Sequence, residues 1–144
     1  MSAFANTAGG IIVLGVSERA GFVPVENFET EKVLNQFVSG MGDAGGRGKL
    51  ANPPKYTIER VELQGVIVLV ITIEELDPSS KPCYVIERGA QGGSYKRIDD
   101  KDVPLSSTEV LTLASYGRAD SERVGTRWRV RARTISTRRW STVR

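Results

Sequence analysis

The stretch Ser2–Val16 reads SAFANTAGGIIVLGV, and we expect the rest of the chain to be organised around it. It begins like the last turn of a helix, breaks at two glycines and continues as a strand. Gly9 and Gly10 can adopt the positive φ angles that end a helix at little steric cost. Asn6 and Thr7 can hydrogen-bond the freed backbone groups locally. These four residues are therefore predicted to have a structural role.

The strand after the glycines, at about residues 10–16, is expected to be central in its sheet. Residues 11–14 form a continuous apolar run, which is typical of a strand covered on both faces. Gly15 indicates a bulge or a close backbone approach. Only about one helical turn precedes Asn6, whereas a stable helix needs about three turns. We therefore expect the natural domain to begin upstream of residue 1, a very short helix being the alternative.

Composition limits the chemistry that the chain can perform. The 144 residues include one cysteine, Cys83, and no histidine. This excludes an internal disulfide, a cysteine-cluster metal site and a nucleophile paired with histidine. No apolar run approaches the roughly 20 residues of a membrane span. We expect a cytoplasmic protein of one domain, without membrane contact, cofactor, metal ion or catalytic residue.

The charges divide the chain into two parts. Residues 1–116 hold 11 Lys and Arg against 15 Asp and Glu, a net charge of −4. Residues 117–144 hold 9 Arg against 2 acidic residues, a net charge of +7. We expect a domain over 1–116 and an arginine-rich tail over 117–144. The tail has three interpretations: a disordered segment, a strand or RNA-binding arm, or the product of a frameshift.

A helix is predicted over residues 30–41, with Thr30 as its N-cap and Gly40 and Gly42 at its end. The loop that follows, residues 43–54, contains the motif Gly45-Gly-Arg-Gly-Lys49. A Walker phosphate loop also needs a further glycine upstream, a hydroxyl after the lysine and a preceding strand. The chain has none of these at the required positions, and we interpret the motif as a flexible basic loop.

Two hairpins are predicted after this loop. The first joins strands at 55–63 and 66–73 through Gln64-Gly65, with a bulge near Glu59-Arg60 because the apolar positions change phase. The second hairpin joins residues 83–87 to 94–98 around a glycine-rich turn. A capping box, Ser106-Ser-Thr-Glu109, then begins a helix that is expected to reach about Tyr116.

Three motifs together resemble a known family. They are the opening stretch, Lys81-Pro-Cys-Tyr84 and Gly93-Ser-Tyr-Lys-Arg97, and they resemble the Schlafen-type AlbA domain over residues 1–113. That domain occurs in bacterial proteins named transcriptional regulators or divergent-AAA ATP-binding proteins. Schlafen-type nucleases use acidic residues in and after the helix before the SAFAN-like motif, a segment that this sequence lacks. The resemblance therefore implies nucleic-acid binding and transfers no catalytic residue.

The candidate nucleic-acid-binding residues are Lys81, Tyr84, Tyr95 and Arg97. Tyr95 and Arg97 share one face of a strand, where they can stack on a base and contact a phosphate. In the alternative interpretation, Tyr95 packs in the core and Arg97 pairs with Glu87. The cluster of Asp99, Asp100 and Asp102 is interpreted as a solvated turn.

The predicted fold is α/β (α+β), with a mixed sheet of about five to six strands flanked by two to three helices. The predicted function is a nucleic-acid-binding regulatory module with DNA or RNA as partner, and a homo-oligomer is allowed. A nucleotide-binding protein of the divergent-AAA type and a non-functional gene fragment are the alternatives.

Overall fold

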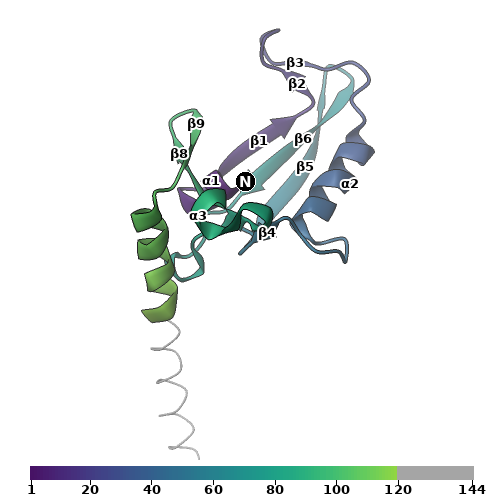
Figure 1. The fold of residues 1–144 in the computed structure, drawn as a ribbon. Helices are drawn as coiled ribbons and strands as arrows, with labels where there is room; N and C mark the ends of the chain where they lie inside the picture. The colour runs from purple at the N-terminus through teal and green to yellow at the C-terminus, as the bar shows by residue number, and fades with distance from the viewer. Residues whose placement is uncertain (120–144) are drawn as a thin grey trace, which may run out of the picture.

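A three-stranded antiparallel sheet, in the order β1–β6–β5, lies at the centre of the fold (Figure 1). The structure is a computed structural model and describes residues 1–119. The sheet consists of β1 (Gly10–Leu14), β5 (Tyr56–Leu63) and β6 (Val66–Ile73). The almost wholly apolar β6 is the middle strand, and most of its apolar side chains are buried.

The β5–β6 hairpin has the tight turn that its sequence predicts. Gln64 and Gly65 have φ angles of 50° and 79°, as a two-residue turn between twisted strands requires. The register then runs without interruption along both strands, so the bulge expected near Glu59-Arg60 is absent from this hairpin. The apolar positions change phase because both faces of β5 carry apolar residues, Ile58 on one face and Val61 on the other.

β1 is an edge strand of this sheet among the described residues, which corrects the expectation that it is central. Its side chains alternate in exposure, and Ile11 and Val13 are 61% and 43% exposed. The face that carries Ile12 lies on the same side of the sheet as α2 (Thr30–Met41). Within the described chain, Ile11 and Val13 thus project from the opposite face, which is open at β1, although Val68 of β6 on that face is buried.

The helix α2 has the predicted bounds and covers one face of the sheet. Phe37 contacts Tyr56 of β5 edge to face, with ring centroids 5.2 Å apart. The Thr30 hydroxyl donates to the Ile67 carbonyl at 2.9 Å, so it links the helix to β6 and Glu29 takes the N-cap position. Gly42 ends the helix in the left-handed conformation, with φ 93°.

The remaining strands form three two-stranded sheets, and the fold is α+β as predicted. They pair β2 (Val16–Ser17) with β3 (Val23–Pro24), β4 (Leu50–Ala51) with β7 (Tyr84–Val85), and β8 (Tyr95–Ile98) with β9 (Lys101–Pro104). The strands are therefore divided among small antiparallel sheets and do not form the single mixed sheet of five to six strands that we expected.

The predicted second hairpin is wrong in its pairing. A single bridge, Tyr84 to Ser94, joins its two halves. The glycine-rich segment between them is helical, as η2 (Ile86–Arg88) and α3 (Gly89–Gly93), and does not form a tight turn. A competing turn at Asp99, whose φ is 54°, folds β8 back onto β9 instead.

A helix that begins at residue 107 follows the predicted capping box. The Ser106 N–H donates to the Glu109 carboxylate at 2.8 Å, and the Glu109 N–H donates back to the Ser106 hydroxyl. The helix continues to 119, so the expected end at Tyr116 falls inside it. A Cβ on Gly117 would lie 2.5 Å from the Ser79 carbonyl oxygen of η1 (Pro78–Ser80), which shows how closely the two segments approach.

The structure does not describe residues 120–144, so most of the expected arginine-rich tail lies outside the described residues. None of the helices within the described part of the chain is long and apolar enough to cross a membrane.

Candidate functional site

The side chain of Asn6 joins two segments that are distant in the sequence. Asn6 ends the short helix α1 (Ser2–Asn6), and its Nδ2 donates to the carbonyls of Cys83 at 2.8 Å and Tyr95 at 2.9 Å. Its Oδ1 accepts the Cys83 N–H at 2.7 Å. The partners are therefore distant backbone groups rather than the local groups that the sequence suggested.

Ser2 and Thr7 extend this connection along β8. The Ser2 hydroxyl donates to the Cys83 carbonyl at 2.8 Å and accepts the Tyr95 N–H at 3.1 Å. The Thr7 hydroxyl donates to the Ala3 carbonyl at 2.8 Å and accepts the Arg97 N–H at 2.9 Å. One edge of β8 faces β9. On the other edge, polar side chains of the opening motif form the backbone hydrogen bonds that a neighbouring strand would otherwise form.

The two glycines of the motif allow close packing around α1. Gly9 has φ 70°, and a Cβ there would lie 2.4 Å from the Ile73 carbonyl oxygen. A Cβ on Gly10 would lie 2.3 Å from the Phe4 ring. A side chain at Gly9 would collide with the backbone of β6, and one at Gly10 would displace the Phe4 ring. The two glycines therefore let α1 and Phe4 pack closely against the central sheet.

Arg97 lies over Phe4, on the outer side of this packing. Its guanidinium carbon is 5.1 Å from the Phe4 ring centroid, within the range of a cation–π contact. Nη1 also donates to the Asp102 carboxylate at 2.7 Å. The Arg97 side chain remains 32% exposed. An arginine has five N–H donors in a planar fork, so this guanidinium is oriented and still has donors for a ligand.

Tyr95 is held by a second arginine. Arg88 of η2 donates from Nη1 to the Tyr95 hydroxyl at 2.6 Å. Tyr95 and Arg97 lie two residues apart on β8, so their side chains share one face. The Arg97–Glu87 pair of the alternative interpretation is absent: the carboxylate partner is Asp102, across the β8–β9 turn.

The structure does not bring all four candidate residues together. The Lys81 ammonium forms an ion pair with the Glu75 carboxylate at 2.6 Å, and the Lys81 side chain is only 9% exposed. Its charge is therefore already compensated within the protein. Tyr84 lies in β7 opposite Ser94, beside the start of β8. The candidate surface therefore consists of Tyr95 and Arg97 with Arg88 and Phe4, two residues that the sequence analysis did not identify.

Ser2, Phe4 and Arg88 were missed for different reasons. Ser2 lies four residues before Asn6, a helical spacing that could have indicated a shared partner. Phe4 lies inside the opening motif and has no separate sequence signal. Arg88 has none either, because its contact with Tyr95 depends on how η2 folds.

The remaining charged residue of β8, Lys96, is engaged in an ion pair. Lys96 points to the opposite face and pairs with Glu109. The hydrogen bond from Lys96 is the largest of the effects that lower the pKa of Glu109 to about 2, and two hydrogen bonds from Ser106 add to it. Within residues 1–119, no three His, Cys, Asp or Glu side chains lie close enough together to hold a metal ion.

Cys83 is fully buried beneath the motif. Burial raises the pKa of its thiol to about 11. A thiol is nucleophilic only as the thiolate, so a raised pKa makes Cys83 unreactive at neutral pH. Its contribution is structural, through the two backbone groups that Asn6 binds.

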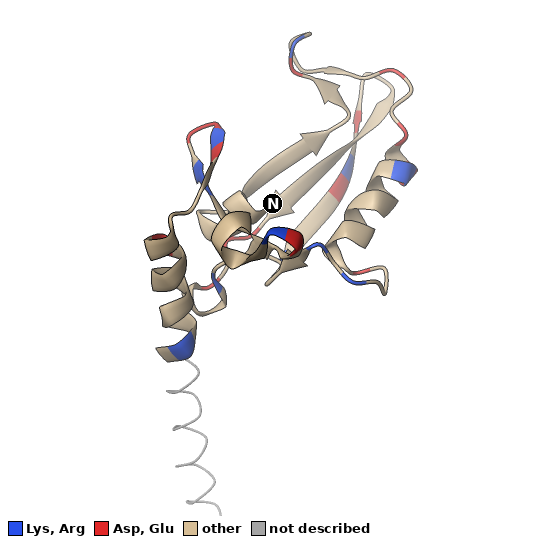
Figure 2. Cartoon of the chain, viewed as in Figure 1, with Lys and Arg blue, Asp and Glu red and all other residues tan. Residues whose placement is uncertain are grey.

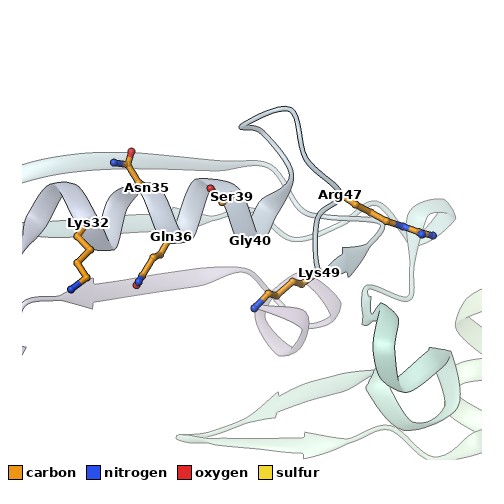
Figure 3. A pocket seen from close by; sticks show the side chains of 7 residues that line it. All are labelled: Lys32, Asn35, Gln36, Ser39, Gly40, Arg47 and Lys49. Atoms are coloured by element: carbon orange, nitrogen blue, oxygen red, sulfur yellow. The ribbon is translucent and has the colours of Figure 1, made fainter.

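A second cluster of polar side chains lies on the other side of the fold. Helix α2 and the loop after it form an open pocket of about 900 Å³. Its lining residues are Lys32, Asn35, Gln36, Ser39, Gly40, Arg47 and Lys49 (Figure 3). Figure 2 shows short basic and acidic segments scattered over a largely uncharged ribbon, whereas no carboxylate lines this pocket.

Comparison with protein families gives a match. The model of the family described as Schlafen, AlbA_2 matches residues 1–106, which is more than half of the chain and contains the whole of the Asn6 network. Comparisons with curated proteins and with solved structures give no match.

Proposed function

The chain belongs to the Schlafen AlbA_2 family, and from this premise we propose that it is a nucleic-acid-binding regulatory module. The proposed contact surface is the face of β8 that carries Tyr95 and Arg97, with Arg88 beside it. The single observation that supports it most is the fixed position of the Arg97 guanidinium, between the Phe4 ring and the Asp102 carboxylate.

This arrangement suits a phosphate contact for a physical reason. A free arginine side chain loses conformational entropy when it binds, whereas a side chain already ordered by its neighbours loses less. The hydroxyl of Tyr95 is likewise fixed by Arg88, which orients a ring that can stack on an unpaired base. Two guanidinium groups and one aromatic ring are a minimal set for binding a nucleic-acid strand.

The surface should bind weakly. Residues 1–116 carry a net charge of −4, so the domain as a whole repels a polyanion. Asp102 neutralises part of the Arg97 charge and competes directly with a phosphate for its donors. We therefore expect that removal of the Asp102 carboxylate strengthens binding. If the ion pair had only a structural role, its removal would not strengthen binding.

The test uses the full chain and fluorescence anisotropy with labelled single-stranded and duplex oligonucleotides at fixed salt. Arg97→Ala should weaken binding by about 1–3 kcal/mol if the contact is direct. Asp102→Asn should strengthen it. Arg60→Ala is the matched control, because Arg60 also pairs with a carboxylate, Glu31, but on β5. Equal affinities for the Arg97 and Arg60 variants would contradict the proposal.

A further inference from the structure

We propose that the pocket between α2 and the loop after it, which contains the motif Gly45-Gly-Arg-Gly-Lys49, binds a phosphate group through Lys32, Gln36 and Lys49. Figure 3 shows these three side chains extending to the same side of α2, whereas Arg47 extends away from them. All three present N–H donors, and the pocket has no carboxylate in its lining. In a domain whose acidic residues outnumber its basic ones, such a lining selects for an anion.

The backbone holds Lys49 in place from both sides. Its N–H donates to the Gly40 carbonyl of α2 at 2.8 Å, and its own carbonyl accepts the Ile86 N–H at 3.0 Å. Gly48 makes this approach feasible, because a Cβ there would lie 2.7 Å from the Met41 carbonyl oxygen. The segment that carries Lys49 is therefore docked on the helix, which corrects the interpretation of the whole glycine motif as a flexible loop.

Lys32 and Gln36 are four residues apart on α2 and so lie on the same helical face. Lys32 pairs with Glu29 at 2.7 Å, but both side chains are more than 60% exposed. Ion pairs this exposed stabilise a helix little, so the ammonium can turn to a ligand at small cost. Lys49 has no ion pair with any residue in the described part of the chain.

The end of α2 does not need these cations for its own hydrogen bonds. The carbonyl of Gly40 accepts the Lys49 N–H, and the carbonyls of Val38 and Ser39 accept N–H groups from Asp43 and Gly42. The last turn of the helix is thus closed by backbone groups alone. The Lys49 ammonium remains available for a ligand.

The inferred site differs from a Walker loop in its chemistry. A Walker loop surrounds phosphate with backbone N–H groups at a helix N-terminus. Here the loop follows the C-terminal end of α2, where the helix dipole is unfavourable to anions, so the side-chain cations must supply the attraction. Binding should therefore depend strongly on salt. The phosphate can belong to a small phosphate ester or to a nucleic-acid backbone.

The test is an NMR titration of the ¹⁵N-labelled full chain with inorganic pyrophosphate. We expect saturable shifts of the Gln36 and Lys49 amides. Lys32→Gln/Lys49→Gln should weaken this binding by roughly tenfold, because it removes both ammonium groups that would contact the ligand. The charge-matched control Arg19→Gln/Lys101→Gln, at exposed positions outside the pocket, should leave it within about twofold of the wild-type affinity, as expected for screened distant charges.

Unchanged amide shifts elsewhere in the spectrum establish that the variants remain folded. A duplex oligonucleotide that displaces pyrophosphate identifies a backbone phosphate as the ligand, and no displacement identifies a small phosphate ester. Shifts confined to residues after 119, or equal weakening in the pocket and control variants, would overturn the inference. Neither outcome depends on Arg97, so the phosphate site and the β8 surface are two proposals that can be refuted independently.

Discussion

The side-chain amide of Asn6 binds both backbone hydrogen-bonding groups of Cys83, a residue 77 positions later in the chain. The same amide nitrogen also reaches the Tyr95 carbonyl. One side chain therefore sets the distance between α1, the segment before β7 and the first residue of β8. This relationship explains why the opening motif matters to the candidate surface, although none of its polar side chains belongs to that surface.

Replacement of Asn6 should destabilise the whole domain. Asn6→Ala leaves the Cys83 N–H and the Tyr95 carbonyl without their side-chain partner, whereas the Cys83 carbonyl keeps the Ser2 hydroxyl. Each unsatisfied buried group costs about 1–3 kcal/mol. We expect a loss of about 3 kcal/mol or more in the free energy of unfolding, measured by urea denaturation. Gln91→Ala, at an exposed position of α3, is the control and should have little effect. Equal midpoints for the two variants would show that the network contributes nothing.

Stability should fall in acid through Glu109. Its pKa is lowered from 4.5 to about 2, chiefly by the Lys96 ammonium. Folding therefore favours the carboxylate, and the resulting stability is present above about pH 4.5 and is lost as the pH falls towards 2. In unfolding experiments over this interval, Glu109→Gln should show a flatter dependence on pH than the wild type.

The control for this measurement is Glu62→Gln, at an exposed position of β5. That variant should retain the acid dependence of the wild type. If both variants gave the same curve, the contacts of Glu109 would have no part in the acid response.

The open face of the central sheet should bind a hydrophobic dye. Ile11 and Val13 project from it, opposite Thr72 and Val70 of β6. Contiguous exposed apolar side chains promote association. Ile11→Thr/Val13→Thr should lower both dye fluorescence and self-association in sedimentation experiments. Ile98→Thr removes a side chain of intermediate exposure, 51%, from β8 and should change neither quantity. A wild-type chain that binds no dye would refute the prediction.

Local patterns predicted the elements that depend on neighbouring residues. The turn at Gln64-Gly65, the capping box at Ser106 and the bounds of α2 all follow from short-range geometry, and the structure has each of them. The second hairpin was wrong because two turn signals compete there. The turn at Asp99 pairs β8 with β9, and the glycine-rich segment is helical.

The exposure of β1 and the interaction partners of Arg97 could not be predicted from local patterns. The apolar run at residues 11–14 shows that both faces of β1 are apolar, but it does not show whether another element covers them. Arg97 carries its charge on the strand face that the alternation predicts, yet its partner depends on the β8–β9 register. The contact of Arg97 with Phe4 joins residues from opposite ends of the domain, so no local pattern reports it.

The dependence of oligonucleotide binding on salt tests the central claim most directly. The arginines after residue 116 contribute equally in the wild type and in the Arg97→Ala variant, so the difference between their slopes isolates Arg97. If Arg97 contacts a phosphate, the slope of log K against log salt for duplex DNA should become shallower by about one in that variant. Identical slopes for the wild type, Arg97→Ala and Arg60→Ala would contradict the account.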